Sequence, residues 1–208
     1  MLTKPTSIRD WILLTGRPGT GKTTAIKQIT QALQAAGVPV QGFYTQEVRS
    51  AQGRSRIGFD VVTVPEGQIG PLARKAPFYS NQNYDVDVPS FERLAIPSLT
   101  IPVERGGAGN ETNSPAAYPT VIILDEIARM ELKSSKFKTA VQKLLDYDKR
   151  CLRLVGTVAM APEGYIVPFC DHVTSQQGVR TIEITSETRD RVTQDVLSYI
   201  KSNWIEER

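Results

Sequence analysis

Cysteine and histidine are nearly absent from this chain of 208 residues, which contains only Cys151, Cys170 and a single histidine, His172. Two cysteines are too few for a disulfide framework, and their spacing does not match a C-x-x-C redox or zinc motif. One histidine cannot supply a histidine-ligated metal site and makes a Ser-His-Asp triad difficult to build. The sequence therefore favours two buried, reduced thiols, a surface or capping histidine, and chemistry that depends on other residue types.

Long apolar runs and a strong charge of one sign are also missing. The uninterrupted apolar stretches near Trp11 and Val121 are about as long as a strand, far shorter than a membrane-spanning helix. Residues 1–10 show no apolar core of a targeting signal. Lysine and arginine number 25 against 22 acidic residues, and a net charge of +3 is too small to indicate a dedicated nucleic-acid or membrane binder. We expect a cytoplasmic protein without a membrane or nucleic-acid partner.

Strands and helices are predicted to alternate along the chain. The apolar runs Trp11–Leu14 and Val121–Leu124 are typical of strands buried on both faces, and the spacing of Ile26, Ile29 and Leu33 predicts a helix over 22–36. Further strands are predicted at 38–44, 56–64, 152–158 and 181–184, and further helices around 91–99, 137–145 and 187–204. This alternation predicts an α/β fold, with a mainly parallel sheet covered by helices on both faces.

Two segments are rich in loop-forming residues. Residues 65–83 are predicted to be mostly loop because of their proline, glycine and asparagine content. Residues 104–117 contain almost nothing that could be buried and are predicted to form a flexible loop that is too short for a domain linker. Residues 1–208 are therefore predicted to form one domain.

A phosphate-binding motif follows the first predicted strand. Residues 16–23 read Gly-Arg-Pro-Gly-Thr-Gly-Lys-Thr and match G-x-x-x-x-G-K-[ST] (Walker A), in the strand-to-helix context that the motif requires. The glycines let backbone N–H groups converge on an anion, and the helix adds its positive dipole end. Lys22 is expected to reach the β and γ phosphates, and the Thr23 hydroxyl to ligate Mg²⁺. The predicted nucleotide-binding residues are Gly16, Arg17, Pro18, Gly19, Thr20, Gly21, Lys22, Thr23 and Thr24.

Two carboxylates follow the apolar run Val121–Leu124. Because ligands of open α/β sheets bind at the carboxyl ends of the strands, Asp125 and Glu126 are expected to face the phosphate loop. Asp125 is the expected partner of Mg²⁺, in the position of a Walker B aspartate. Glu126 is expected to point to the other side of the chain and to activate the attacking water as a catalytic base. The alternatives are a helix-cap or turn acid for Asp125 and a surface acid or salt-bridge partner for Glu126.

Several arginines and one threonine are weaker candidates. Arg49, Arg54 and Arg56 cluster on a predicted hairpin, where a solvated face is the simpler explanation. Thr157, near the end of a predicted strand, is either a contact of the γ phosphate or water, or a threonine chosen for its β-propensity. The remaining candidates for neutralising transition-state charge, which the sequence does not rank, are Arg17, Arg74, Arg129 and Arg189.

The chain also resembles the nucleoside-triphosphatase family that includes the cancer-related nucleoside-triphosphatase. The resemblance spans nearly the whole sequence, and its most specific parts are residues 43–49 and 56–62. Its other parts are 16–24, 37–40, 70–74, 84–87, 90–92, 124–127 with Met130 and Glu131, 156–158, and Thr185 with Glu187 and Arg189. Ala128-Arg129 and Thr188 depart from the family pattern, which usually has Gly-Lys and Asn there.

This resemblance implies a monomeric, RecA-like P-loop fold and Mg²⁺-dependent hydrolysis of nucleoside triphosphates to diphosphate and phosphate, with loose base selectivity. The main alternative is a nucleoside or nucleotide kinase, which shares the phosphate grip but needs an acceptor pocket and usually a lid. A nucleotide-dependent switch or nucleic-acid motor is a further alternative, and the small net charge argues against the motor.

Overall fold

The computed structural model describes residues 9–53, 55–76, 84–101, 120–147, 152–160 and 167–205. The loop predicted at 104–117 lies outside these residues. The strands are β1 Arg9–Thr15, β2 Val40–Arg49, β3 Arg56–Val64, β4 Ile69–Lys75, β5 Tyr84–Val86, β6 Val121–Ile127, β7 Leu152–Val158 and β8 Val179–Glu183. The helices are α1 Lys22–Ala35, α2 Val88–Ser98, α3 Ser135–Leu145, α4 Pro168–Thr174 and α5 Arg189–Ile200, with short helical turns η1 Glu131–Lys133 and η2 Lys201–Ile205.

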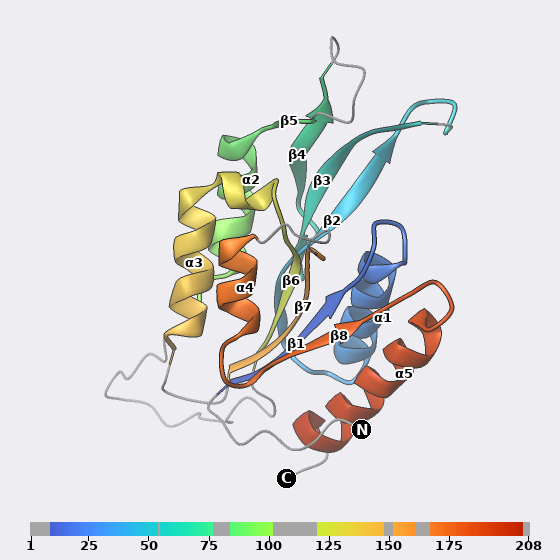
Figure 1. Cartoon of the computed structure of the whole chain (residues 1–208), viewed down its shortest axis with the longest axis vertical. Helices are drawn as coiled ribbons and strands as arrows, with labels where there is room; N and C mark the ends of the chain where they lie inside the picture. Colours follow the sequence, from blue (N-terminus) through green and yellow to red (C-terminus); the bar gives the residue numbers. More distant parts are fainter. Residues whose placement is uncertain are drawn as a thin grey trace.

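The eight strands form one mixed sheet in the order β5-β4-β3-β2-β6-β7-β1-β8 (Figure 1). The pairings among β2, β6, β7, β1 and β8 are all parallel, whereas β3, β4 and β5 extend the sheet beyond β2 by antiparallel pairing. Strand β7 lies between β1 and β6, so the strand before the phosphate loop and the strand with the two acids are separated by one strand. This RecA-like arrangement confirms the predicted α/β class.

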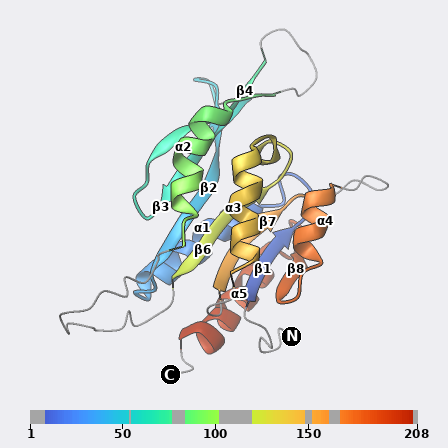
Figure 2. The same cartoon turned by 90° about the vertical axis from the view of Figure 1, so that its left-hand side faces the viewer.

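Helices cover both faces of the sheet because its central strands are apolar on both faces. Trp11 and Leu13 of β1 belong to the core beneath α2, α3 and α4, whereas Ile12 and Leu14 face the core beneath α1 and α5. Figures 1 and 2 show the two helix layers on opposite sides of the sheet. The continuous apolar run of β1 is therefore explained by burial of the strand on both faces, as predicted.

The helix after the phosphate loop begins and ends where the sequence predicts. Ile26, Ile29 and Leu33 are buried on one face of α1. Gly37 has a left-handed φ of 71°, and its N–H donates to the Gln34 carbonyl while the Val38 N–H donates to Leu33. These are the hydrogen bonds of a Schellman termination, which a glycine accommodates without steric cost.

The prediction of a loop over 65–83 is wrong for part of that range, because β4 occupies Ile69–Lys75. Gly70 and Pro71 concealed the strand, since both residues are unusual within strands. Pro71 lies where the register between β3 and β4 shifts, and Leu72 and Ala73 are buried in the core beneath α2. The seven-residue helix α4 was not predicted, and α2 begins earlier than predicted because Asp87 accepts a capping hydrogen bond from the Ser90 N–H.

In the described part of the chain, none of the helices has both the length and the apolar character needed to cross a bilayer.

Candidate active site

The phosphate loop connects buried strand β1 to helix α1, as predicted. The Thr20 N–H and hydroxyl both donate to the Arg17 carbonyl, which closes the tip of the loop. Lys22 folds back so that its ammonium donates to the Gly16 carbonyl over 3.0 Å. The first turn of α1 has neither a side-chain cap nor an acidic residue. Its free N–H groups and positive dipole end are therefore available to an anion.

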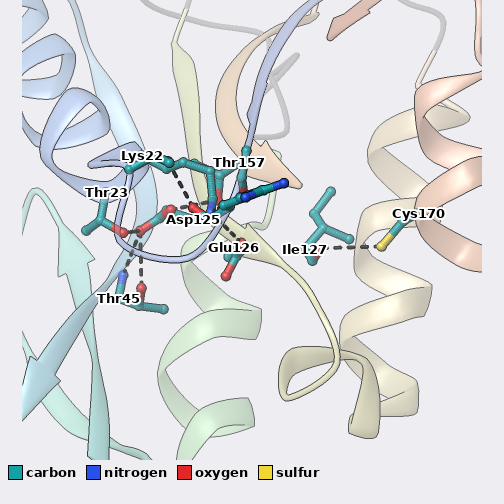
Figure 3. A network of polar contacts seen from close by, with 11 residues as sticks. Lys22, Thr23, Thr45, Asp125, Glu126, Ile127, Thr157 and Cys170 are labelled. Carbon is teal, nitrogen blue, oxygen red and sulfur yellow. Dashed lines mark hydrogen bonds and ion pairs between the residues drawn. The ribbon is translucent and has the colours of Figure 1, made fainter. Parts of the chain in front are cut away.

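The Asp125 carboxylate is buried and held by three threonine hydroxyls (Figure 3). The Thr23 hydroxyl donates to Oδ2 over 2.9 Å, and the Thr157 hydroxyl donates to Oδ1 over 2.7 Å. Thr45 donates to Oδ2 from both its hydroxyl, at 3.2 Å, and its N–H, at 3.3 Å. Because donors from α1, β2 and β7 surround it, this carboxylate has a fixed orientation against the end of the phosphate loop.

A glycine allows β2 to approach β6 closely enough for the Thr45 contacts. A Cβ built on Gly42 would lie 1.9 Å from the Ile123 carbonyl oxygen, and the φ of Gly42 is 125°, which disfavours other residues. The sequence did not identify Thr45 as a site residue. The only signal was its place within 43–49, one of the two stretches that carry the family resemblance most specifically.

Glu126 also lies beside the phosphate loop, where it forms an ion pair with Lys22. The Lys22 ammonium lies 3.6 Å from Glu126 Oε1, with side-chain exposures of 12% and 27%. Burial raises the pKa of Glu126, and the charge of Asp125 adds to the increase, while Lys22 partly offsets both. A carboxylate with a raised pKa is a stronger base than an exposed glutamate, which suits proton abstraction.

A second glutamate, Glu131, lies buried next to this pair. It opens η1 and is fully buried, and neither of its carboxyl oxygens has a hydrogen-bond partner among the described residues. Burial raises its pKa well above the ordinary range, and the negative charges of Glu126 and Asp125 raise it further. Its carboxyl group therefore holds a proton under conditions in which an exposed glutamate is ionised. The sequence placed Glu131 within the family pattern but gave it no role.

Replacing Glu131 with glutamine should remove a pH-dependent cost to stability. The unfolded chain releases the Glu131 proton near its ordinary pKa, whereas the folded chain retains it, so wild-type stability falls as pH rises above that value. The slope is at most about 1.4 kcal/mol per pH unit for this group. Denaturant unfolding should be measured without Mg²⁺ or nucleotide between about pH 5 and pH 8. The free energy of unfolding of Glu131→Gln should increase relative to that of wild type as pH rises.

Glu92 provides a control whose pH dependence should lie below the range of this measurement. Hydrogen bonds from Lys136 and Ser134 lower its pKa, so its contribution to stability is present above its ordinary pKa and lost as pH falls. Between about pH 5 and pH 8 the free energy of unfolding of Glu92→Gln should therefore differ from that of wild type by a nearly constant amount, and this difference should shrink only at lower pH. If Glu131→Gln tracks wild type in parallel at every pH, the buried carboxyl does not hold its proton.

The structure separates the arginine candidates. Arg49 pairs with Glu47, Arg56 with Glu47 and the Tyr84 hydroxyl, and Arg74 with Asp60, all on the antiparallel strands β2 to β5. Arg54 lies outside the described residues, and Arg17 and Arg129 are exposed. Arg189 is the candidate that lies against the loop, because a Cβ on Gly21 would be 2.4 Å from its Cδ.

The other minor candidates have structural contacts. Thr157 donates to Asp125, which explains its polar side chain at a fully buried position. His172 is exposed on α4 and lies 3.1 Å from the Gln142 side-chain oxygen of α3, which agrees with a surface role. The buried Cys170 thiol donates to the Ile127 carbonyl, and Cys151 lies outside the described residues.

The oxygen donors near the loop fit a magnesium ion. Mg²⁺ prefers hard oxygen ligands and is usually held by one or two carboxylates together with substrate phosphates. The Thr23 hydroxyl and the Asp125 carboxylate lie within 2.9 Å of each other at the mouth of the loop. The described residues contain no group of three or more histidine, cysteine or acidic side chains that could hold a metal alone. A site that is completed by the phosphates of a nucleotide needs no such group.

The fold and the site together define a P-loop NTPase. The model of the family described as "NTPase" matches residues 11–197. The chain is 38% identical to the nucleoside-triphosphatase THEP1 of Thermotoga petrophila over 194 residues, which cover 92% of this chain and 93% of that protein. The chain therefore belongs to this NTPase family, which confirms the resemblance seen in the sequence.

Two solved structures of the family are similar to this fold. The solution structure of a human cancer-related nucleoside triphosphatase has a TM-score of 0.70 and 36% identity, covering 93% of this chain and 98% of its own. The crystal structure of THEP1 from Aquifex aeolicus has a TM-score of 0.67 and 35% identity, covering 92% and 99%.

Proposed function

We propose that this protein hydrolyses nucleoside triphosphates to nucleoside diphosphates and phosphate in a reaction that requires Mg²⁺. The observation that carries the proposal is the convergence of Lys22 and Thr23, at the end of the phosphate loop, on the acid pair Asp125 and Glu126. The relatives from Thermotoga and Aquifex and the human protein are all named nucleoside-triphosphatases, which supports the same reaction class.

In the proposed reaction, the phosphate loop binds the phosphates, and the end of β6 provides the catalytic base. The loop amides and the Lys22 ammonium hold the phosphate oxygens and stabilise the charge that develops on them. The Thr23 hydroxyl and the Asp125 carboxylate would hold Mg²⁺, which would neutralise charge on the β and γ phosphates. The threonine contacts to Asp125 orient that carboxylate in advance.

Glu126 is the proposed general base. It orients a water molecule and takes one of its protons as the water oxygen bonds to the γ phosphorus. The bond from that phosphorus to the bridging oxygen breaks, and the nucleoside diphosphate leaves with the electron pair. The raised pKa of Glu126 matches this role, because it makes proton abstraction more favourable.

A kinase would share every phosphate contact but would deliver the γ phosphate to an acceptor hydroxyl or phosphate. An assay of the products separates the two reactions. With ATP, Mg²⁺ and a panel of nucleosides and nucleoside monophosphates, a hydrolase releases inorganic phosphate at the same rate with or without an acceptor. A phosphorylated acceptor that forms at the expense of free phosphate would favour the kinase.

Hydrolysis should be broad across the four ribonucleotides. The proposed strong contacts all reach phosphates or Mg²⁺, which are identical in ATP, GTP, CTP and UTP, and the sequence contains no N-K-x-D motif of the kind that reads guanine. A site with fixed donors for one base can reject analogues by about 10⁴-fold. We expect kcat/KM for the four substrates to lie within about a hundredfold, or about 2.7 kcal/mol. The measurement is the four values at one pH and one Mg²⁺ concentration, and a preference of about 10⁴-fold for one base would contradict it.

A further inference from the structure

The two sides of the phosphate loop carry different chemistry. In the sheet order β6-β7-β1-β8, the acid pair of β6 lies on one side of β1, and β8 with the following helix α5 lies on the other. Helix α5 packs beside α1 on the same face of the sheet (Figure 1). If the γ phosphate of a bound triphosphate points to Glu126, the nucleoside end extends towards the start of α5.

Arg189, the first residue of α5, contacts the phosphate loop directly. A Cβ built on Gly21 would lie 2.4 Å from Cδ of Arg189, 3.1 Å from Nη1 and 3.4 Å from Nε. The arginine side chain therefore runs along the last residue of the loop, in space that only a glycine leaves open. The contact with Arg189 is thus a further reason for glycine at position 21, besides its left-handed φ of 96° and its place in the phosphate-binding motif.

The backbone around Arg189 is fixed by reciprocal capping hydrogen bonds. The Thr185 N–H donates to the Thr188 hydroxyl at 3.0 Å, and the Thr188 N–H donates to the Thr185 hydroxyl at 3.2 Å. The Arg189 N–H donates to the Thr185 carbonyl, and the Thr193 hydroxyl donates to the Arg189 carbonyl. The arginine therefore projects from a rigid helix start rather than from a mobile loop.

The charge around the Arg189 guanidinium favours an electron-rich ligand. The guanidinium lies at the positive end of the α1 dipole, against Gly21, the residue before Lys22. It forms an ion pair with Asp190, whose side chain is 82% exposed. An exposed pair of this kind contributes little by itself. Because Nε donates to Asp190 over 2.9 Å, one in-plane donor is occupied by a carboxylate that would repel a phosphate. The planar face of the guanidinium and the N–H donors of its two Nη groups remain for a ligand, and the face is the part that can lie against a base.

We propose that Arg189 holds the nucleoside end of the bound triphosphate by stacking its guanidinium plane on the base. This inference rests on the proposed function, since it needs a triphosphate in the loop. Stacking by a guanidinium uses the π-face that every base has, so it binds purines and pyrimidines with little discrimination. Arg189 is then a binding residue for the base and leaves the chemical step to Lys22 and Glu126.

Inorganic tripolyphosphate separates a base contact from a phosphate contact, because it has the phosphate chain without the nucleoside. With the full chain and Mg²⁺, dissociation constants would be measured by calorimetry for non-hydrolysable analogues of ATP and UTP and for tripolyphosphate. Arg189→Ala should weaken both nucleotides by about tenfold and leave tripolyphosphate within about twofold of wild type. Arg189→Lys should behave like Arg189→Ala, since lysine keeps the charge but lacks the plane.

Arg191→Ala is the matched control, because it removes the same charge from an exposed position on α5. It should leave all three dissociation constants unchanged, and circular dichroism of each variant shows whether it is folded. Equal weakening of nucleotides and tripolyphosphate by Arg189→Ala would assign the contact to phosphate and overturn the inference, and so would no weakening at all. A wild-type chain that binds nucleotides but hydrolyses none would overturn the proposed function and leave the stacking result readable. A chain that binds neither ligand would overturn both.

Discussion

Lys22→Ala should lose most of the hydrolytic activity and bind triphosphates more weakly. The Lys22 ammonium points into the loop, where it donates to the Gly16 carbonyl at 3.0 Å. In the proposed reaction it would stabilise the γ phosphate as the bond to the β phosphate breaks. Removing one preorganised contact of this kind typically costs about 10²- to 10³-fold in rate, or about 3 to 4 kcal/mol. Steady-state phosphate release at saturating Mg²⁺ measures the loss.

Lys27→Ala is the matched control for that experiment. Lys27 lies on the same helix, and its ammonium stacks over the Tyr44 ring at 4.6 Å from the centroid. We expect this variant to keep activity close to that of wild type. Full activity of Lys22→Ala under the same conditions would mean that the loop does not bind the reacting phosphates.

Glu126→Gln should still bind ATP and Mg²⁺ but should turn over at least about 10²-fold more slowly. Glutamine keeps the shape of the side chain and can accept a hydrogen bond from water, but it cannot take the proton. The effect should therefore appear in kcat, with little change in the dissociation constant of a non-hydrolysable triphosphate. A variant that hydrolyses at the wild-type rate would show that Glu126 is structural and that another group activates the water.

Asp125→Asn, at the neighbouring residue, should impair the reaction in a different way. The proposed function gives Asp125 a role in holding Mg²⁺, so this change should raise the Mg²⁺ concentration needed for half-maximal activity. Two adjacent carboxylates thus give two distinguishable results, one in turnover and one in metal requirement. Identical behaviour of the two variants would count against separate roles.

The parts of the fold that follow from local sequence were predictable. The strand before Gly16, the helix after Lys22 and the apolar run before Asp125 each show their periodicity within a short window, and the structure has all three. Strand β4 was missed because Gly70 and Pro71 are turn residues in most contexts. Its burial under α2 depends on a tertiary contact that a short window does not contain.

The site residues that lie together in one segment could be predicted from the sequence. Those that are brought together only by the packing of the sheet could not. Thr45 and Thr157 are far from Asp125 in sequence, and they reach it because β2 and β7 flank β6. The burial of Glu131 and the contact of Arg189 with Gly21 depend in the same way on packing between distant segments. The sequence named Thr157 as one of two alternatives and Arg189 as one of several unranked arginines, and it included Thr45 and Glu131 only as members of the family pattern.

Hydrolysis in water labelled with heavy oxygen tests the central proposal most directly. If Glu126 activates a water molecule for attack on the γ phosphorus, each turnover of ATP with Mg²⁺ puts one labelled oxygen into inorganic phosphate and none into the diphosphate. Mass spectrometry of both products reads the label, and chelation of Mg²⁺ should stop its incorporation. Label in the diphosphate, or turnover that releases no labelled phosphate, would contradict hydrolysis by this site.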